Sequence, residues 1–114
     1  MIKVIDKSVD RVAVLALEGK LTGLEGRGVI QEKVRESTKG KINNVVLDLH
    51  RVTWIDSTGL GELIASLSST KKNGGTLVLT NIQAPVQSLL KMTNLDQIFD
   101  TFDSVDEAVV KLSS

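Results

Sequence analysis

The apolar positions of this chain form short runs separated by segments with helical spacing. Three runs are apolar at most positions, and they span residues 12–17, 45–49 and 76–80. Such short runs, apolar on both faces, are typical of strands buried within a sheet. The first residues alternate instead, with apolar side chains at Ile2 and Val4. This alternation predicts a leading strand, and turn-forming residues at 8–11 separate it from the first buried run.

Four segments have the spacing of amphipathic helices. The clearest ends at Lys72, before Asn73-Gly-Gly, and carries its apolar face at Leu60, Leu63, Ile64 and Leu67. The inward positions of the other three are Val29, Ile30 and Val34; Val86, Leu89 and Leu90; and Val105, Ala108, Val109 and Leu112. Pro85 suits the first turn of the third helix, and Ser104-x-x-Glu107 is a capping box that opens the last.

The connections between these elements are expected as follows. Four glycines make the segment 19–28 largely loop, and the first helix is expected to run from about Glu25 or Arg27 to Thr38. A short apolar approach, 52–55, leads into the clearest helix, and a short strand is expected at about 98–102.

Short strands that alternate with helices are typical of an α/β fold, in which helices pack against a sheet. We expect about five strands with about four helices packed against them. No helix separates the two leading strands, so the sheet is expected to be mixed rather than purely parallel. At 114 residues with no repeat or linker, the chain is predicted to form a single domain over 1–114.

Composition narrows the range of partners. The chain has 14 basic and 14 acidic residues and few aromatic ones, so nucleic acid is not an expected partner. It has no cysteine, which excludes disulfides and thiolate metal sites. The longest apolar run is far short of the roughly 20 residues that cross a bilayer, and the N-terminus lacks the features of a signal peptide. A cytoplasmic location without membrane insertion is therefore expected.

The segment Trp54-Ile-Asp-Ser-Thr-Gly-Leu-Gly61 lies where a strand leads into a helix. Backbone N–H groups at a helix start lack internal partners, and with the helix dipole they attract anions such as phosphate. Ser57 is expected at that end with its hydroxyl exposed. Gly59 and Gly61 lack side chains, so another protein's backbone or a nucleotide could approach closely. The simpler interpretation is that Asp56 or a neighbouring hydroxyl only caps the helix.

Four segments follow one another in the order of a known family. They are Val46-Leu-Asp-Leu, Val52-Thr-Trp-Ile-Asp-Ser-Thr-Gly-Leu-Gly-Glu-Leu, Asn73-Gly-Gly-Thr-Leu-Val-Leu and residues 86–99. Together they resemble the STAS domain of bacterial anti-sigma-factor antagonists. The resemblance implies a STAS-like fold and a phosphoacceptor serine at Ser57. It also implies that residues around that serine support partner binding, namely Thr22, Asp56, Thr58, Gly59, Leu60 and Gly61.

The resemblance further implies a partner switch. In this family the unphosphorylated antagonist binds an anti-sigma factor, usually a serine kinase with a histidine-kinase-like ATPase fold, and so frees a sigma factor. Phosphorylation ends the interaction, and a PP2C-type phosphatase restores it. The domain itself is then no enzyme and needs no cofactor or metal. Thr22 departs from the family, which commonly has an acidic residue there that helps to engage the kinase.

Other classes of protein fit the sequence less well. A catalytic serine needs a base, and the single histidine, His50, is expected to be a solvated residue at a strand end. A receiver domain would use Asp48 or Asp56, but its acidic cluster and its strand order are missing. The glycine spacings match neither the P-loop motif nor the glycine-rich motif that binds dinucleotides. The serious alternative is a STAS domain that acts as an unphosphorylated interaction module, attached to an anion transporter or to a lipid-trafficking or stress complex.

Overall fold

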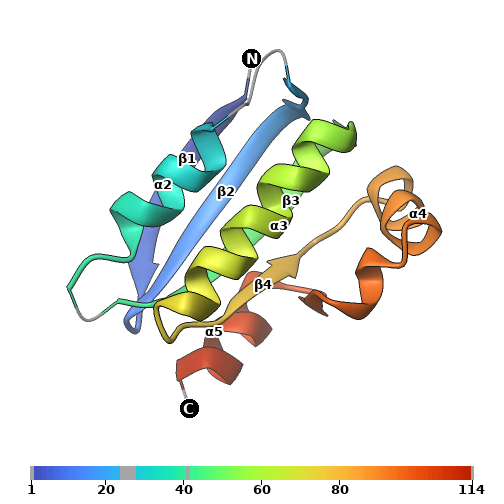
Figure 1. The fold of residues 1–114 in the computed structure, drawn as a ribbon. Coiled ribbons are helices and arrows are strands. Elements are labelled where there is room, and N and C mark those ends of the chain that lie inside the picture. The colour runs from blue at the N-terminus through green and yellow to red at the C-terminus, as the bar shows by residue number, and fades with distance from the viewer. Residues whose placement is uncertain (1, 24–27, 41, 114) are drawn as a thin grey trace.

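The computed structural model describes residues 2–23, 28–40 and 42–113, and the predicted α/β fold is confirmed in it (Figure 1). The strands lie in the sheet in chain order, as β1 (Lys3–Val9), β2 (Val12–Leu21), β3 (Asn44–Ile55), β4 (Leu77–Thr80) and β5 (Asp100–Phe102). β1 is antiparallel to β2, whereas the pairs from β2 to β5 are parallel. The sheet is therefore mixed, as the absence of a helix between the first two strands predicted.

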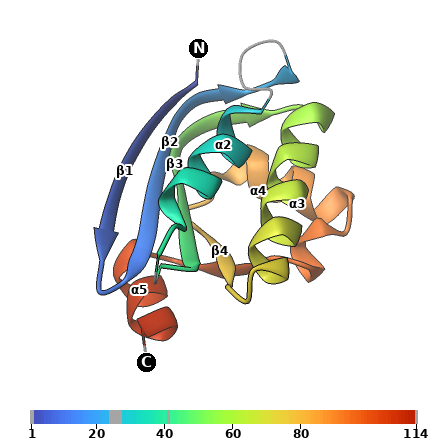
Figure 2. The same ribbon diagram turned by 60° about the vertical axis from the view of Figure 1, so that its left-hand side comes forward.

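Helices cover the two faces of the sheet unequally. The described helices are α2 (Val29–Ser37), α3 (Ser57–Lys72), α4 (Ala84–Met92) and α5 (Val105–Ser113), with a 3₁₀ turn, η1 (Leu95–Gln97), after α4. α2, α3 and α4 contribute to one hydrophobic cluster, on one side of the sheet. α5 packs on the other side, which Figure 2 shows clearly.

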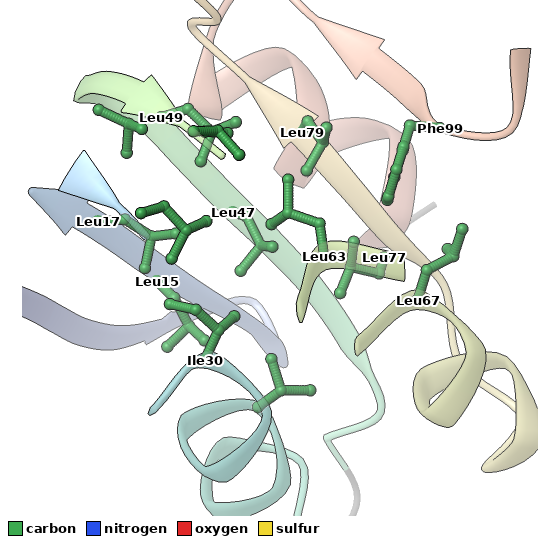
Figure 3. Packing of buried hydrophobic residues seen from close by; sticks show 14 of the residues in the cluster. Leu15, Leu17, Ile30, Leu47, Leu49, Leu63, Leu67, Leu77, Leu79 and Phe99 are labelled. Atoms are coloured by element: carbon green, nitrogen blue, oxygen red, sulfur yellow. The ribbon is translucent and has the colours of Figure 1, made fainter. Parts of the chain in front are cut away.

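The main core is aliphatic and lies between the sheet and α2, α3 and α4 (Figure 3). Leu47 on β3 and Leu63 on α3 are fully buried there, and Phe99 closes the end near α4 and β4. The apolar runs that the sequence singled out supply the strands, and the helical stripes supply the facing side chains. This packing fixes where β3 ends and α3 begins.

α5 covers only part of its side of the sheet. Its Ala108 and Val109 pack with Val12, Val14, Val46 and Val78, which all lie in the first halves of their strands. The second halves of β2 and β3 therefore extend beyond α5, toward the start of α3. In Figure 1, α3 begins at the upper end of the molecule and α5 lies at the lower end.

Two predicted strands were too short. β2 continues through Gly19 to Leu21, so the loop expected from residue 19 was wrong over these positions, and β3 runs without interruption to Ile55. The second halves of β2 and β3 pair with each other, and their register shifts at two places within residues 16–20 of β2. β4 pairs only with β3 residues up to Asp48, and α5 does not cover this part of the sheet. Exposed polar residues therefore interrupt the apolar pattern on which the prediction depended.

The predicted ends of two further elements also differ from those in the structure. The last strand is Asp100–Phe102, because the N–H groups of Ile98 and Phe99 hydrogen-bond back to the Leu95 carbonyl of the 3₁₀ turn η1 instead of pairing with β4. α2 begins at Val29, and the start expected near Glu25 or Arg27 lies outside the described residues. At the capping box, the Ser104 hydroxyl accepts a hydrogen bond from the Glu107 N–H at 3.1 Å, as predicted.

Candidate functional site

The candidate site forms where β3 passes into α3. Asp56 has extended backbone angles (φ −98°, ψ −177°) and precedes the first helical residue, Ser57. Its Oδ1 accepts a hydrogen bond from the Gly59 N–H at 2.8 Å, the arrangement of a helix N-cap. The capping interpretation of the sequence therefore holds for Asp56, which leaves the hydroxyls of the following residues for other roles.

Asp56 also joins this helix start to the end of β2. Its Oδ2 accepts a hydrogen bond from the Gly23 N–H at 3.1 Å, and its own N–H donates to the Leu21 carbonyl at 3.2 Å. Backbone donors stabilise the charged carboxylate, so the bonds from Gly59 and then Gly23 lower the pKa of Asp56 from its ordinary value. One carboxylate thus fixes the β2 end against the first turn of α3.

Replacing Asp56 with asparagine is expected to destabilise the protein at neutral pH, because an NH2 group then faces one of the two backbone donors. The carboxylate has a lowered pKa in the folded state, so its contribution is complete above the unfolded-state pKa of about 3.9. That contribution is lost as the pH falls through the folded-state pKa. Urea unfolding between pH 3 and pH 7 checks this, and a wild-type advantage that stays constant at low pH would contradict it.

Ser57 and Thr58 lie exposed in the first turn of α3, as expected for a hydroxyl open to modification. That turn contains no acidic residue. Thr22 is half-buried in the connection that follows β2. Its neighbour Gly23 lies against Thr58, because a Cβ built at Gly23 would be 3.0 Å from the Thr58 Cβ and Oγ1. Thr58, the neighbour of Ser57, thus lies beside Gly23 in the connection between β2 and α2, of which residues 24–27 lie outside the described part.

The two glycines of the motif differ in their surroundings. A Cβ at Gly59 would lie 2.2 Å from the Leu21 carbonyl oxygen and 2.9 Å from the Ile55 Cγ2. The sequence interpretation, that Gly59 lets a partner approach, is therefore wrong, because β2 already occupies that space. Gly61 is exposed and a Cβ there would meet no atom within 4 Å, so its outer side is open. Leu60 is buried in the core and supports the site from inside.

Sequence reasoning missed Glu62, a buried carboxylate one residue beyond the motif. Its side chain accepts hydrogen bonds from the Gly28 N–H at 2.8 Å and from the Gln31 Nε2 at 2.6 Å, and the residue is 6% exposed. These bonds hold the start of α2 against α3. A signal existed in the sequence: Glu62 lies on a helical stripe with small and hydroxyl residues, Gly59, Ser66 and Thr70, and all four are buried. Such a stripe indicates close contact with another helix.

Truncating Glu62 to alanine is expected to cost about 1–3 kcal/mol of folding free energy, because two partly buried hydrogen bonds, from the Gly28 N–H and the Gln31 amide, are lost. Urea unfolding measures this loss. Glu36→Ala is the matched control, since Glu36 is exposed and forms an ion pair with Lys33 at 3.7 Å on the outside of α2. Equal stability of the two variants would show that the Glu62 hydrogen bonds contribute nothing.

Other candidates from the sequence lie away from this site. His50 is exposed inside β3 rather than at its end, so its expected position was wrong, because β3 continues to Ile55. Asp48 is half-buried and accepts hydrogen bonds from the Asn81 Nδ2 at 3.0 Å and from the His50 N–H at 3.1 Å.

Over residues 2–23, 28–40 and 42–113, no group of three or more His, Cys, Asp or Glu is placed to hold a metal ion. In the same residues, no helix has the length and apolarity to span a bilayer.

The fold and the motif together define the class of protein. The profile of the STAS domain matches residues 3–108, and the chain belongs to this family. A candidate anti-sigma factor antagonist of Thermotoga maritima is 32% identical over 104 residues, which are 90% of this chain and 91% of the relative. The crystal structure of a candidate antagonist from the same organism has a TM-score of 0.86 at 30% identity and covers 97% of this chain and 95% of its own.

A more distant neighbour shares the fold. The anti-sigma factor antagonist SpoIIAA has been solved in its unphosphorylated form, with a TM-score of 0.70 at 18% identity, covering 96% of each chain. The phosphorylated form of SpoIIAA, from Bacillus, has a TM-score of 0.71 at 16% identity and covers 96% of this chain and 97% of its own. These two structures share the fold of the chain, and its place in the anti-sigma factor antagonist group rests on the STAS profile and on the Thermotoga maritima relative.

Proposed function

We propose that this protein is a phosphorylation-controlled anti-sigma-factor antagonist. In its unphosphorylated form it binds an anti-sigma factor, a serine kinase with a histidine-kinase-like ATPase fold, and so frees a sigma factor. Phosphorylation of Ser57 ends that binding, and a PP2C-type phosphatase reverses it. The chain works as a single domain over 1–114 in the cytoplasm, by binding and without catalysis of its own.

The observation that carries this proposal is the position of Ser57. It is exposed and is the first residue of a 16-residue helix, where backbone N–H groups and the helix dipole favour negative charge. Because Asp56 already caps the helix, the Ser57 hydroxyl is not needed for that purpose. A phosphate at Ser57 can therefore be accommodated without loss of the fold. The phosphorylated SpoIIAA shares this fold, which supports the view that a domain of this fold can carry a phosphate.

The charge of the phosphate accounts for the loss of binding. A phosphoserine carries about −1.5 to −2 charges at neutral pH. If a partner covers Ser57, that charge must be paired or stripped of water, and a like-charged or apolar partner surface makes this unfavourable by several kcal/mol. Each 1.4 kcal/mol is about a factor of ten in affinity. Binding is lost while folding is kept.

Phosphoryl transfer by the source organism's own kinases tests the proposal. The protein is incubated with ATP and each purified serine kinase of the histidine-kinase-like ATPase type, and peptide mass spectrometry locates the phosphate. We expect one phosphate, on Ser57, which Ser57→Ala abolishes and Thr58→Ala leaves in place. Thr58 is the matched control because it is also exposed in the same helical turn. A phosphate on Thr58 alone, or none with any of these kinases, would overturn the proposed switch.

A further inference from the structure

The uncovered part of the sheet presents three successive rows of paired residues beside the start of α3. Ile5, Ala16 and Asp48 form one row across β1, β2 and β3, and Lys3, Glu18 and Arg51 form the next. Lys20 pairs with Trp54 in the last row. We call these eight residues the open sheet face. They lie on the side of the sheet on which α5 packs, beyond the part that α5 covers.

Two large apolar side chains are exposed on this face. Trp54 is 48% exposed and Ile5 is 47% exposed, although both belong to strands of a well-packed sheet. Beside Ile5 is a shallow groove of about 310 Å3, which Ala16, Glu18, Asp48 and Arg51 help to line. Tryptophan is one of the residues enriched among those that dominate binding energy at protein interfaces. The exposed tryptophan and the groove lie on the same uncovered face of the sheet, which indicates a docking surface.

The charges that this face presents outward are positive. The side chains of Lys3 and Arg51 are about 70% exposed, and Lys20 is exposed as well. Glu18 is largely covered, and it is paired with Lys3 at 3.9 Å and with Arg51 at 3.4 Å. Asp48 is half-buried and already accepts two hydrogen bonds. A partner that covers the face therefore meets exposed cations, with the apolar side chains of Ile5 and Trp54 in the two outer rows. An acidic surface complements those cations.

The face is continuous with the phosphorylation site. Trp54 precedes Ser57 by three residues, and Leu21, next to Lys20, accepts the hydrogen bond from the Asp56 N–H. The ends of β2 and β3 thus bring the open sheet face and the first turn of α3 to the same edge of the sheet. A protein that covers Ser57 can reach Trp54 and Lys20 without any change in the fold.

We propose that the open sheet face, with Trp54 in the row nearest to Ser57, is a second part of the surface that binds the kinase, and that it receives an acidic patch of that partner. This inference rests on the proposed function. It also explains the direction of the switch, because a partner that is acidic at this edge is repelled when Ser57 gains a phosphate. Lys3, Lys20 and Arg51 then speed association and orient the complex, while Trp54 slows its dissociation.

Binding to the purified serine kinase that phosphorylates Ser57, measured by titration calorimetry, tests the inference. Trp54→Ala is expected to weaken binding about tenfold or more. Lys20→Glu is expected to weaken it and to reduce its dependence on salt. The matched controls are Met92→Ala, which also truncates an exposed apolar side chain, and Lys39→Glu, which makes the same charge change at an exposed position elsewhere. Trp54→Phe retains an aromatic ring and is expected to recover most of the affinity.

The outcomes separate this inference from the proposed function. Urea unfolding of each variant shows first that the fold is kept, and the Lys20→Glu result stands even if Trp54→Ala is destabilised. If the kinase binds the wild type and all variants equally, the open sheet face plays no part, and the proposed function survives. If the Trp54 and Lys20 variants change only self-association in sedimentation, the occupant is a second copy, and the inference is wrong. If the kinase binds no form of the protein, both proposals fall.

Discussion

Replacing Gly59 with alanine is expected to destabilise the protein by about 2–4 kcal/mol, because the new methyl group collides with backbone. The Cβ would lie 2.2 Å from the Leu21 carbonyl oxygen, and the end of β2 must shift to relieve the contact. That carbonyl also accepts the hydrogen bond from the Asp56 N–H, so the shift weakens the junction between β2 and α3. Urea unfolding measures the loss.

Gly61→Ala provides the matched control two residues further along the same helix. A Cβ at Gly61 meets no atom within 4 Å, so alanine brings only its higher helix propensity. We expect a gain of about 0.5–1 kcal/mol. The two variants thus have opposite signs for the same chemical change. If Gly59→Ala were as stable as Gly61→Ala, the close approach of β2 to the start of α3 would be wrong.

Replacing Ser57 with glutamate is expected to weaken binding to the kinase at least about tenfold, because a permanent negative charge then lies in the interface. The fold is expected to be kept or slightly stabilised, since an acidic residue in the first turn of a helix is favourable by about 0.3–1 kcal/mol. Titration calorimetry measures the affinity and urea unfolding the stability. Ser57→Ala, which adds no charge, is expected to bind like the wild type.

Ser68→Glu is the matched control for this charge. Ser68 is also an exposed serine on α3, but it lies three turns further along the helix, away from the site. We expect it to leave the affinity unchanged. If Ser57→Glu binds as tightly as the wild type, charge at this position does not control the interaction. The alternative, a STAS domain that acts as an unphosphorylated interaction module, would then account better for the protein.

The sequence predicted those elements whose residues are buried on a regular period. The apolar residues of the run at 45–49 and Leu60, Leu63 and Leu67 of the α3 stripe are buried as expected, because helices pack on both sides of this part of the sheet. The second half of β3 was not recognised as strand, since His50, Arg51 and Trp54 are exposed there. Its backbone pairs with β2, but neither β4 nor α5 covers it. Its side chains therefore have no regular apolar pattern from which a strand could be predicted.

The sequence predicted the position of Ser57 but not the contacts around it. The motif predicted an exposed hydroxyl at a helix start, and Ser57 lies there. Three contacts that the sequence did not predict join segments more than 30 residues apart. The Asp56 carboxylate bonds to Gly23, Gly59 lies against Leu21, and Glu62 accepts a hydrogen bond from Gly28. Contacts of this kind depend on the tertiary fold, so local spacing in the sequence does not contain them.

In the proposed switch, the negative charge of a phosphate on Ser57, at the start of α3, decides whether the partner binds. The most direct measurement compares the affinity of the kinase for the unphosphorylated protein with its affinity for the same protein carrying a phosphate on Ser57. We predict that phosphorylation weakens binding at least about a hundredfold, equivalent to about 2.7 kcal/mol, and that a PP2C-type phosphatase restores it. Equal affinity of the two forms would contradict the account.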